Sequence, residues 1–137
     1  MLLEDRNAVI YGGGGAIGGA VARDFAREGA RVFLAGRTLA TLDKVAEQIR
    51  STGGVAETAQ VVDALDEQAV EEHIGEVMEQ AGSIDVSFNA ISIRDVQLIP
   101  LAEMSREDFI SPIVTGTSTH FLTARAAGRR MAEGARA

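Results

Sequence analysis

A glycine-rich turn close to the N-terminus restricts this chain to a small number of folds. An apolar segment of strand length, Ala8 to Tyr11, is followed by the glycine-rich stretch Gly12 to Gly19, and helical periodicity begins after it. Glycine adopts positive φ and lets a backbone come close to a ligand. The free amides and the dipole at the start of a helix favour an anion. A strand, a glycine turn and a helix in this order therefore predict a pyrophosphate site. The alternative is a turn that only closes the strand onto the helix.

Strand-length apolar segments alternate with helical segments along the rest of the chain. The expected strands are residues 8–11, 31–35, 55–62 and 84–90, and the later expected helices are residues 39–49, 67–81 and 105–133. Asp66 is expected to cap the third helix and Gly82 to end it. Strict alternation implies parallel strands with right-handed crossovers. The predicted fold is α/β: one domain, residues 1–137, with a Rossmann-like doubly wound parallel sheet of order 3-2-1-4 and helices on both faces.

The glycine turn resembles the Thr-Gly-x-x-x-Gly-Ile-Gly turn of the short-chain dehydrogenase/reductase family. Two positions differ, because Tyr11 replaces a small hydroxyl residue and Ala16 replaces the middle glycine. The resemblance implies a nicotinamide dinucleotide at this turn. Its expected contacts there are Gly12, Gly14, Gly15, Ala16, Ile17 and Gly18.

The residues after the second expected strand bear on which dinucleotide is bound. Gly36 is followed by Arg37 and Thr38. Enzymes that prefer NAD carry an acidic residue here for the ribose hydroxyls, whereas a guanidinium suits a 2′-phosphate through charge-assisted hydrogen bonds. We therefore expect Arg37 and Thr38 to contact the cofactor and NADP(H) to be preferred over NAD(H). The alternative is a surface arginine that follows a strand.

Two further expected contacts follow the third and fourth strands, where such sheets bind ligands. Asp63 and Ala64 stand where the family has Asp-Val beside the adenine ring, although Asp63 would serve equally well to cap a turn. Asn89, Ala90 and Ile91 stand in the segment that resembles the family's Asn-Asn-Ala-Gly. The resemblance implies that this segment lines the cofactor ribose and steadies the sheet.

The family's catalytic residues have no counterpart here. The family uses a Ser and a Tyr-x-x-x-Lys, in which the lysine prepares the tyrosine to act as a general acid or base. This sequence has one tyrosine, Tyr11, in the first strand and one lysine, Lys44, in the second helix. A proton-relay asparagine of the family aligns with Gly116. We therefore expect no catalytic residue among these positions, and a chain truncated before the family's fifth strand.

Charge and composition exclude several classes of function. The net charge of −7 argues against nucleic-acid binding, and no apolar run approaches the roughly 20 residues that span a bilayer. The absence of cysteine excludes thiol chemistry and disulfides. His73 and His120 are isolated, so no metal site is expected, and His73 is expected at a solvated or boundary position. The expected location is the cytoplasm.

Three functional hypotheses remain open at this level. The first is the cofactor-binding part of an NADP-dependent oxidoreductase that acts on an alcohol or carbonyl substrate. The second is a module that binds NADP(H) without catalysis, and the third is an assembly module with an empty turn. The fourth expected strand would be an open apolar edge, and the family's fourth helix often packs against its copy, so we expect a homo-oligomer.

Overall fold

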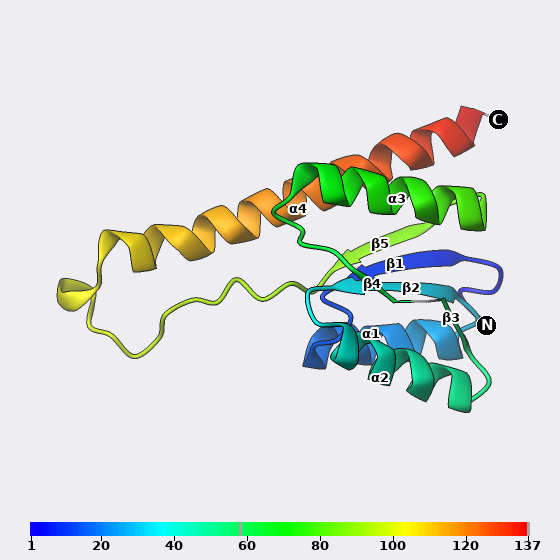
Figure 1. Cartoon of the computed structure of the whole chain (residues 1–137), viewed down its shortest axis with the longest axis horizontal. Helices are drawn as coiled ribbons and strands as arrows, with labels where there is room; N and C mark the ends of the chain where they lie inside the picture. Colours follow the sequence, from blue (N-terminus) through cyan, green and yellow to red (C-terminus); the bar gives the residue numbers. More distant parts are fainter. Residues whose placement is uncertain (58, 137) are drawn as a thin grey trace.

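The computed structural model describes residues 1–57 and 59–136, which form a parallel sheet between two layers of helices (Figure 1). The strands are β1 (Asn7–Tyr11), β2 (Arg31–Gly36), β3 (Val55–Ala56), β4 (Gln60–Val61) and β5 (Val86–Asn89). The helices are α1 (Ala16–Arg27), α2 (Leu39–Ser51), α3 (Glu67–Ala81) and α4 (Arg106–Arg136), with a 3₁₀ turn at Leu101–Glu103. Helices α1 and α2 cover one face of the sheet, and α3 and the second half of α4 cover the other (Figure 1).

The strand order confirms the predicted topology. The sheet runs β3-β2-β1-β5, and every pairing is parallel. The expected third strand, residues 55–62, differs because β3 and β4 pair with opposite ends of β2. Residue 58 of that expected strand lies outside the described residues, as does residue 137. The expected fourth strand is shorter than predicted and is limited to Val86–Asn89, the residues β1 can pair with.

Alternate residues of the two central strands supply two separate cores. Ala8, Ile10, Val32 and Leu34 face α1 and α2. Val9, Tyr11, Phe33 and Ala35 face α3 and α4. Because both faces are covered, the central strands are apolar throughout, as expected of a buried parallel sheet.

The predicted ends of α3 are confirmed, whereas α2 and α4 continue to Ser51 and Arg136, beyond the expected ends at residues 49 and 133. The Asp66 side chain accepts a hydrogen bond from the Ala69 amide at 3.1 Å, and Gly82 follows α3 in the left-handed conformation with φ of 82°. The Ser105 hydroxyl accepts from the Asp108 amide at 3.0 Å and so caps α4. Pro112 lies inside α4, and the helix continues through it without a break.

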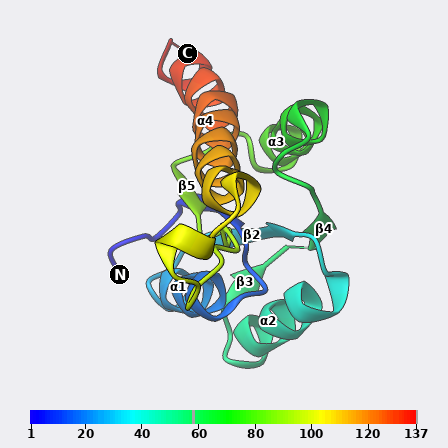
Figure 2. The ribbon, with the colours of Figure 1, turned by 90° about the vertical axis from the view of Figure 1, so that its left-hand side faces the viewer.

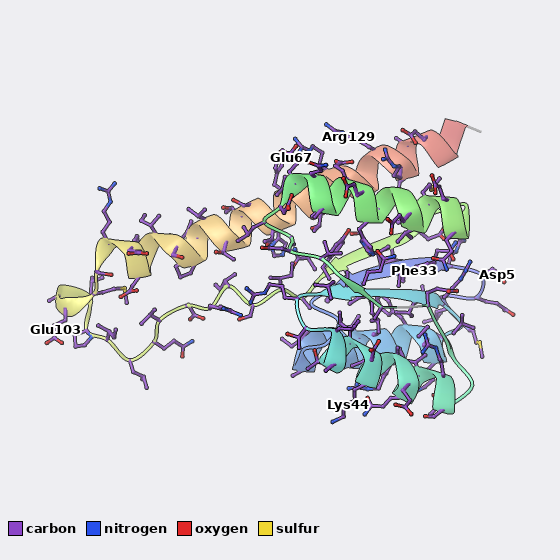
Figure 3. All side chains as sticks on the ribbon, viewed as in Figure 1. Asp5, Phe33, Lys44, Glu67, Glu103 and Arg129 are labelled. Atoms are coloured by element: carbon purple, nitrogen blue, oxygen red, sulfur yellow. The ribbon has the colours of Figure 1, made fainter. Side chains whose placement is uncertain are left out.

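The first half of α4 extends beyond the sheet. Together with the chain from residue 92 to residue 105 it forms an arm that leaves the body of the protein at the carboxyl ends of the strands (Figures 1 and 2). Phe109, Ile113 and Val114 on this arm are about half exposed. The second half of α4 lies along α3, where Arg125 pairs with Glu67. Figure 3 labels Glu67 and Arg129 on these two neighbouring helices.

His73 corrects one expectation from the sequence. It was expected at a solvated or boundary position, but only 4% of it is exposed, and its ring meets the Tyr11 ring edge-on with centroids 5.8 Å apart. Helix α3 turns this residue toward the sheet with Val70, Ile74 and Val77. Burial lowers the pKa of His73 to about 4, and Glu76 opposes this only in part.

Among the helices of the described residues, none has both the length and the apolar character to cross a membrane.

Candidate functional site

A cavity of about 490 Å³ lies at the carboxyl ends of the strands, between the glycine turn, the ends of β2, β4 and β5, and α4. This is the edge at which doubly wound sheets bind ligands. Most of the residues expected to contact a cofactor line it, namely Gly12, Gly14, Gly15, Arg37, Thr38, Asp63, Ala64, Ala90 and Ile91. The expected contacts Ala16, Ile17, Gly18 and Asn89 lie beside the cavity and are not part of its lining.

Two glycines of the turn are required by the packing of the chain itself. Gly12 has φ of 72°, and a Cβ atom on it would lie 2.6 Å from the carbonyl oxygen of Ala90 at the end of β5. A Cβ atom on Gly18 would lie 2.1 Å from the carbonyl oxygen of Gly12. These contacts fix the turn against the sheet and set where α1 begins.

Gly15 differs from these two because an added Cβ atom would meet only ordinary van der Waals contact. It is exposed, with φ of −80°, and the nearest atom to an added Cβ would be the Gly12 carbonyl oxygen at 3.4 Å. Gly15 is the N-cap of α1 and makes no side-chain capping bond, while Ala16 and Ile17 follow it as exposed residues. The first amides of α1 therefore point outward with the positive end of the helix dipole. This arrangement fits a phosphate group.

A second positively polarised region lies at the end of β2. Arg37 is exposed and lines the cavity, and its guanidinium has no hydrogen-bond or ion-pair partner within residues 1–57 and 59–136. Thr38 is the N-cap of α2 and also lacks a side-chain capping bond. The Thr41 hydroxyl donates to the Thr38 carbonyl at 2.9 Å. A free cation thus stands next to an uncapped helix N-terminus.

Asp63 has the turn-capping role that the sequence left open. One of its carboxylate oxygens, Oδ1, accepts from the Leu65 amide at 3.0 Å, and its carbonyl accepts from the Asp66 amide. The residue is nevertheless exposed and lines the cavity beside Ala64. Its second carboxylate oxygen is available to a ligand.

Asn89 fastens the end of β5 to α4. Its side-chain oxygen accepts from the Ile91 amide at 2.9 Å, and its side-chain nitrogen donates to the Thr123 hydroxyl at 3.3 Å. Asn89 therefore positions Ala90 and Ile91, which reach the cavity. This placement agrees with the expected role in steadying the sheet.

Several cavity residues were not identified from the sequence. Ser111, Thr115 and Thr119 line the cavity from α4, and Arg94 lines it from the loop after β5. The spacing of the three hydroxyl residues, four apart along a helix, is a signal that the sequence contained. Nothing in the local sequence indicated that Arg94 would turn toward the cavity.

Tyr11 and Lys44 do not form an acid–base pair. Tyr11 is 1% exposed and belongs to the core under α3 and α4, where burial, helped by the charge of Glu71, raises the pKa of its phenol. Lys44 is exposed on α2, which covers the opposite face of the sheet (Figure 3). The described arrangement can bind an elongated anionic ligand, and these two residues cannot exchange a proton within it.

Comparison with known proteins agrees with this geometry. A family model described as short chain dehydrogenase matches residues 6–137. L-rhamnose 1-dehydrogenase (NAD(P)(+)) from Azotobacter vinelandii is 34% identical over 139 residues, covering 97% of this chain and 52% of the relative. A dehydrogenase/reductase structure from Sinorhizobium meliloti 1021 is 31% identical, with a TM-score of 0.83 over 94% of this chain and 50% of that one. A metagenomic short-chain oxidoreductase solved in complex with NADP is 28% identical, with a TM-score of 0.79 over 96% of this chain and 58% of that one.

Nearly all of this chain aligns, but it spans about half the length of these relatives.

Proposed function

The chain belongs to the short-chain dehydrogenase family, and from this premise we propose that its cavity binds NADP(H) in preference to NAD(H). For the whole protein we propose an alcohol or a carbonyl compound as the substrate. A hydride would be transferred between this substrate and the cofactor. The observation that carries the cofactor proposal is Arg37, a cation without a partner among the described residues that lines the cavity.

The residues of the cavity fit a dinucleotide in three respects. The open position at Gly15 and the uncapped start of α1 suit the pyrophosphate. Arg37 and the uncapped start of α2 suit a 2′-phosphate. Asp63 retains one oxygen for the adenine amino group. These supports are independent of one another because they come from three different loops.

The chain's own part in the reaction is binding and orientation. When bound, the nicotinamide ring supplies the carbon that accepts or donates the hydride. The glycine turn and Arg37 would hold the two phosphate-bearing ends, and Ala90 and Ile91, positioned by Asn89, would support the middle of the ligand. We propose that proton transfer to the substrate oxygen requires residues other than Tyr11 and Lys44.

Cofactor titrations of the wild-type chain and of Arg37→Asp test the proposal. We expect NADPH to bind the wild type at least about tenfold more tightly than NADH, because one charge-assisted contact contributes about 1.5–3 kcal/mol. Arg37→Asp is expected to abolish or reverse that preference. Arg27→Asp, the same charge change on an exposed α1 residue outside the cavity, is the control and should retain it. An unchanged preference in Arg37→Asp would refute the role of Arg37.

A second candidate is a module that binds the dinucleotide without catalysis. The separation of Tyr11 and Lys44 on opposite sides of the sheet favours it. Absorbance at the reduced nicotinamide band separates the two candidates. Loss of NADPH in the presence of a carbonyl substrate supports the oxidoreductase, whereas tight binding without loss supports the module.

We also propose self-association through the arm. Phe109, Ile110, Ile113 and Val114 place an apolar surface on the first half of α4, each between 41% and 53% exposed. Contiguous apolar surface of this kind is typical of an interface. A second copy of the chain is the expected partner.

A further inference from the structure

The charged residues of the cavity are unevenly distributed. Arg37, Asp63 and Arg94 are its charged lining residues within the described chain. Arg37 and Asp63 follow β2 and β4, whereas Arg94 follows β5, on the other side of the central strand β1. The proposed cofactor site uses the first two, and Arg94 is left as a cation at the opposite end.

The loop that carries Arg94 is anchored against α4. A Cβ atom added at Gly116 would lie 3.0 Å from a methyl carbon, Cγ2, of Ile93, so the residue before Arg94 packs closely on the helix next to Thr115. The Arg94 amide donates to the Ser92 hydroxyl at 3.3 Å. Gly116 thus leaves room for this loop beside the cavity.

Arg94 itself adopts a left-handed backbone conformation, with φ of 53°. This conformation costs a non-glycine residue free energy, and such residues concentrate at ligand sites. Within residues 1–57 and 59–136 its guanidinium forms no ion pair. The neighbouring carboxylate of Asp95 accepts instead from the Gln97 side chain at 2.7 Å.

Helix α4 adds hydroxyl groups at the same end. Ser111, Thr115 and Thr119 are spaced four residues apart, so they lie on one face of the helix, and all three line the cavity. The Thr119 hydroxyl donates to the Gly116 carbonyl at 3.4 Å. In the part of the chain that the structure describes, the hydroxyls of Ser111 and Thr115 have no partner. Arg94, Ser111 and Thr115 therefore line the end of the cavity beyond the proposed cofactor phosphates.

We propose that this end of the cavity is a subsite for the carboxylate of the substrate, with Arg94 as its cation and Ser111 and Thr115 as additional donors. The inference rests on the proposed function, because it assigns the cofactor to the Arg37 side. It narrows the substrate class from any alcohol or carbonyl compound to a small acid that carries a hydroxyl or a keto group. A guanidinium with nearby hydroxyl donors binds a carboxylate through charge-assisted hydrogen bonds.

Two six-carbon probes test the proposal on the full 137-residue chain saturated with NADP⁺. D-gluconate and D-sorbitol share a polyhydroxylated carbon chain. Gluconate ends in a carboxylate where sorbitol has a hydroxymethyl group. Calorimetric titration should show gluconate binding at least about tenfold more tightly than sorbitol. Added salt should weaken gluconate binding and leave sorbitol binding unchanged.

Three variants separate the subsite from other effects. Arg94→Gln should reduce gluconate affinity about tenfold to the level of sorbitol, and Arg94→Lys should restore part of it, because lysine keeps the charge without the planar fork. Arg27→Gln, an exposed arginine outside the cavity, should leave the preference unchanged. Neither Arg94 variant should alter the Kd of NADPH.

Different results would contradict the anionic subsite, the assignment of Arg94 and the proposed function. Equal binding of the two probes, or binding of neither to a chain that is saturated with cofactor, overturns the anionic subsite while leaving the cofactor proposal intact. A weaker NADPH affinity in Arg94→Gln would assign Arg94 to the cofactor instead. Failure of the wild-type chain to bind NADPH would refute the proposed function, and the proposed subsite with it.

Discussion

Replacing Gly18 with alanine tests whether the glycine turn is held by contacts within the chain. A Cβ atom at this position would lie 2.1 Å from the Gly12 carbonyl oxygen, 2.8 Å from the Gly12 carbonyl carbon and 3.1 Å from the Gly13 Cα. All three are backbone atoms, so no side-chain rotation relieves the contact. The turn or the start of α1 must move by about 1 Å for ordinary van der Waals contact to be restored.

The expected cost follows from two opposing effects. Overpacking of a tight site costs about 1–3 kcal/mol, and a backbone clash of this size belongs at the upper end. Alanine recovers about 1 kcal/mol in a helix because it is a better helix former than glycine. We expect a net loss of about 2 kcal/mol, which corresponds to a Tm decrease of about 6–10 °C in differential scanning calorimetry for a domain of this size.

Gly15→Ala is the matched substitution in the same turn. Its backbone suits any residue and the added methyl meets only ordinary contact, so the main cost is the loss of glycine as a favoured N-cap, about 1 kcal/mol or less, and Tm should fall by less than about 5 °C. The methyl would nevertheless project into the cavity and lower the affinity for NADPH. A Tm for Gly18→Ala equal to that of the wild type, or an equally large decrease in Gly15→Ala, would refute the assignment of one glycine to packing and the other to the ligand.

Three further predictions test other parts of the account. His73 has a folded pKa of about 4, below its unfolded value, so the unfolded state binds more protons and stability is lost as pH falls from about 6.5 to 4. This amounts to about 3 kcal/mol at pH 4, and denaturant titrations of His73→Phe should show a correspondingly smaller loss than the wild type. Asp66→Ala removes the cap of α3 and should cost about 1 kcal/mol in urea unfolding, with a change below about 0.3 kcal/mol contradicting the cap. Ile113→Glu, on the exposed arm, should shift the chain toward monomer in light scattering after size-exclusion chromatography, and a wild-type chain that is already monomeric would contradict self-association.

The fold could be predicted from the sequence because its strongest signals are local. The apolar strands, the helical periodicity, Asp66 and Gly82 each act within a few residues, and parallel alternation then allows few topologies. The interruption of the third strand was not predicted, because it depends on which residues of β2 are available as partners. His73 was misplaced because glutamates surround it in sequence, while the rotation of α3 turns it toward Tyr11.

Part of the candidate site could likewise be predicted from the sequence, and part could not. The place of the glycine turn, Arg37 and Asp63 at the cavity could be predicted, because each of them comes directly after a strand. Arg94 and Thr115 reach the cavity only because a long loop returns along α4 and packs at Gly116, which is a tertiary contact. Nothing in the local sequence indicated the place of Arg94, and for Thr115 the sequence offered only the four-residue spacing that it shares with Ser111 and Thr119.

Amide chemical shifts of the ¹⁵N-labelled chain, recorded with and without NADPH, test the central claim most directly. If the dinucleotide lies across the glycine turn, the largest changes should occur at Gly15 to Ile17, at Arg37 and Thr38, and at Ala90 and Ile91. Arg27 and Gly53 line a separate cavity away from the glycine turn, and their amides should show no change. Unchanged amides at the start of α1, or changes centred on Arg27 and Gly53, would contradict the account.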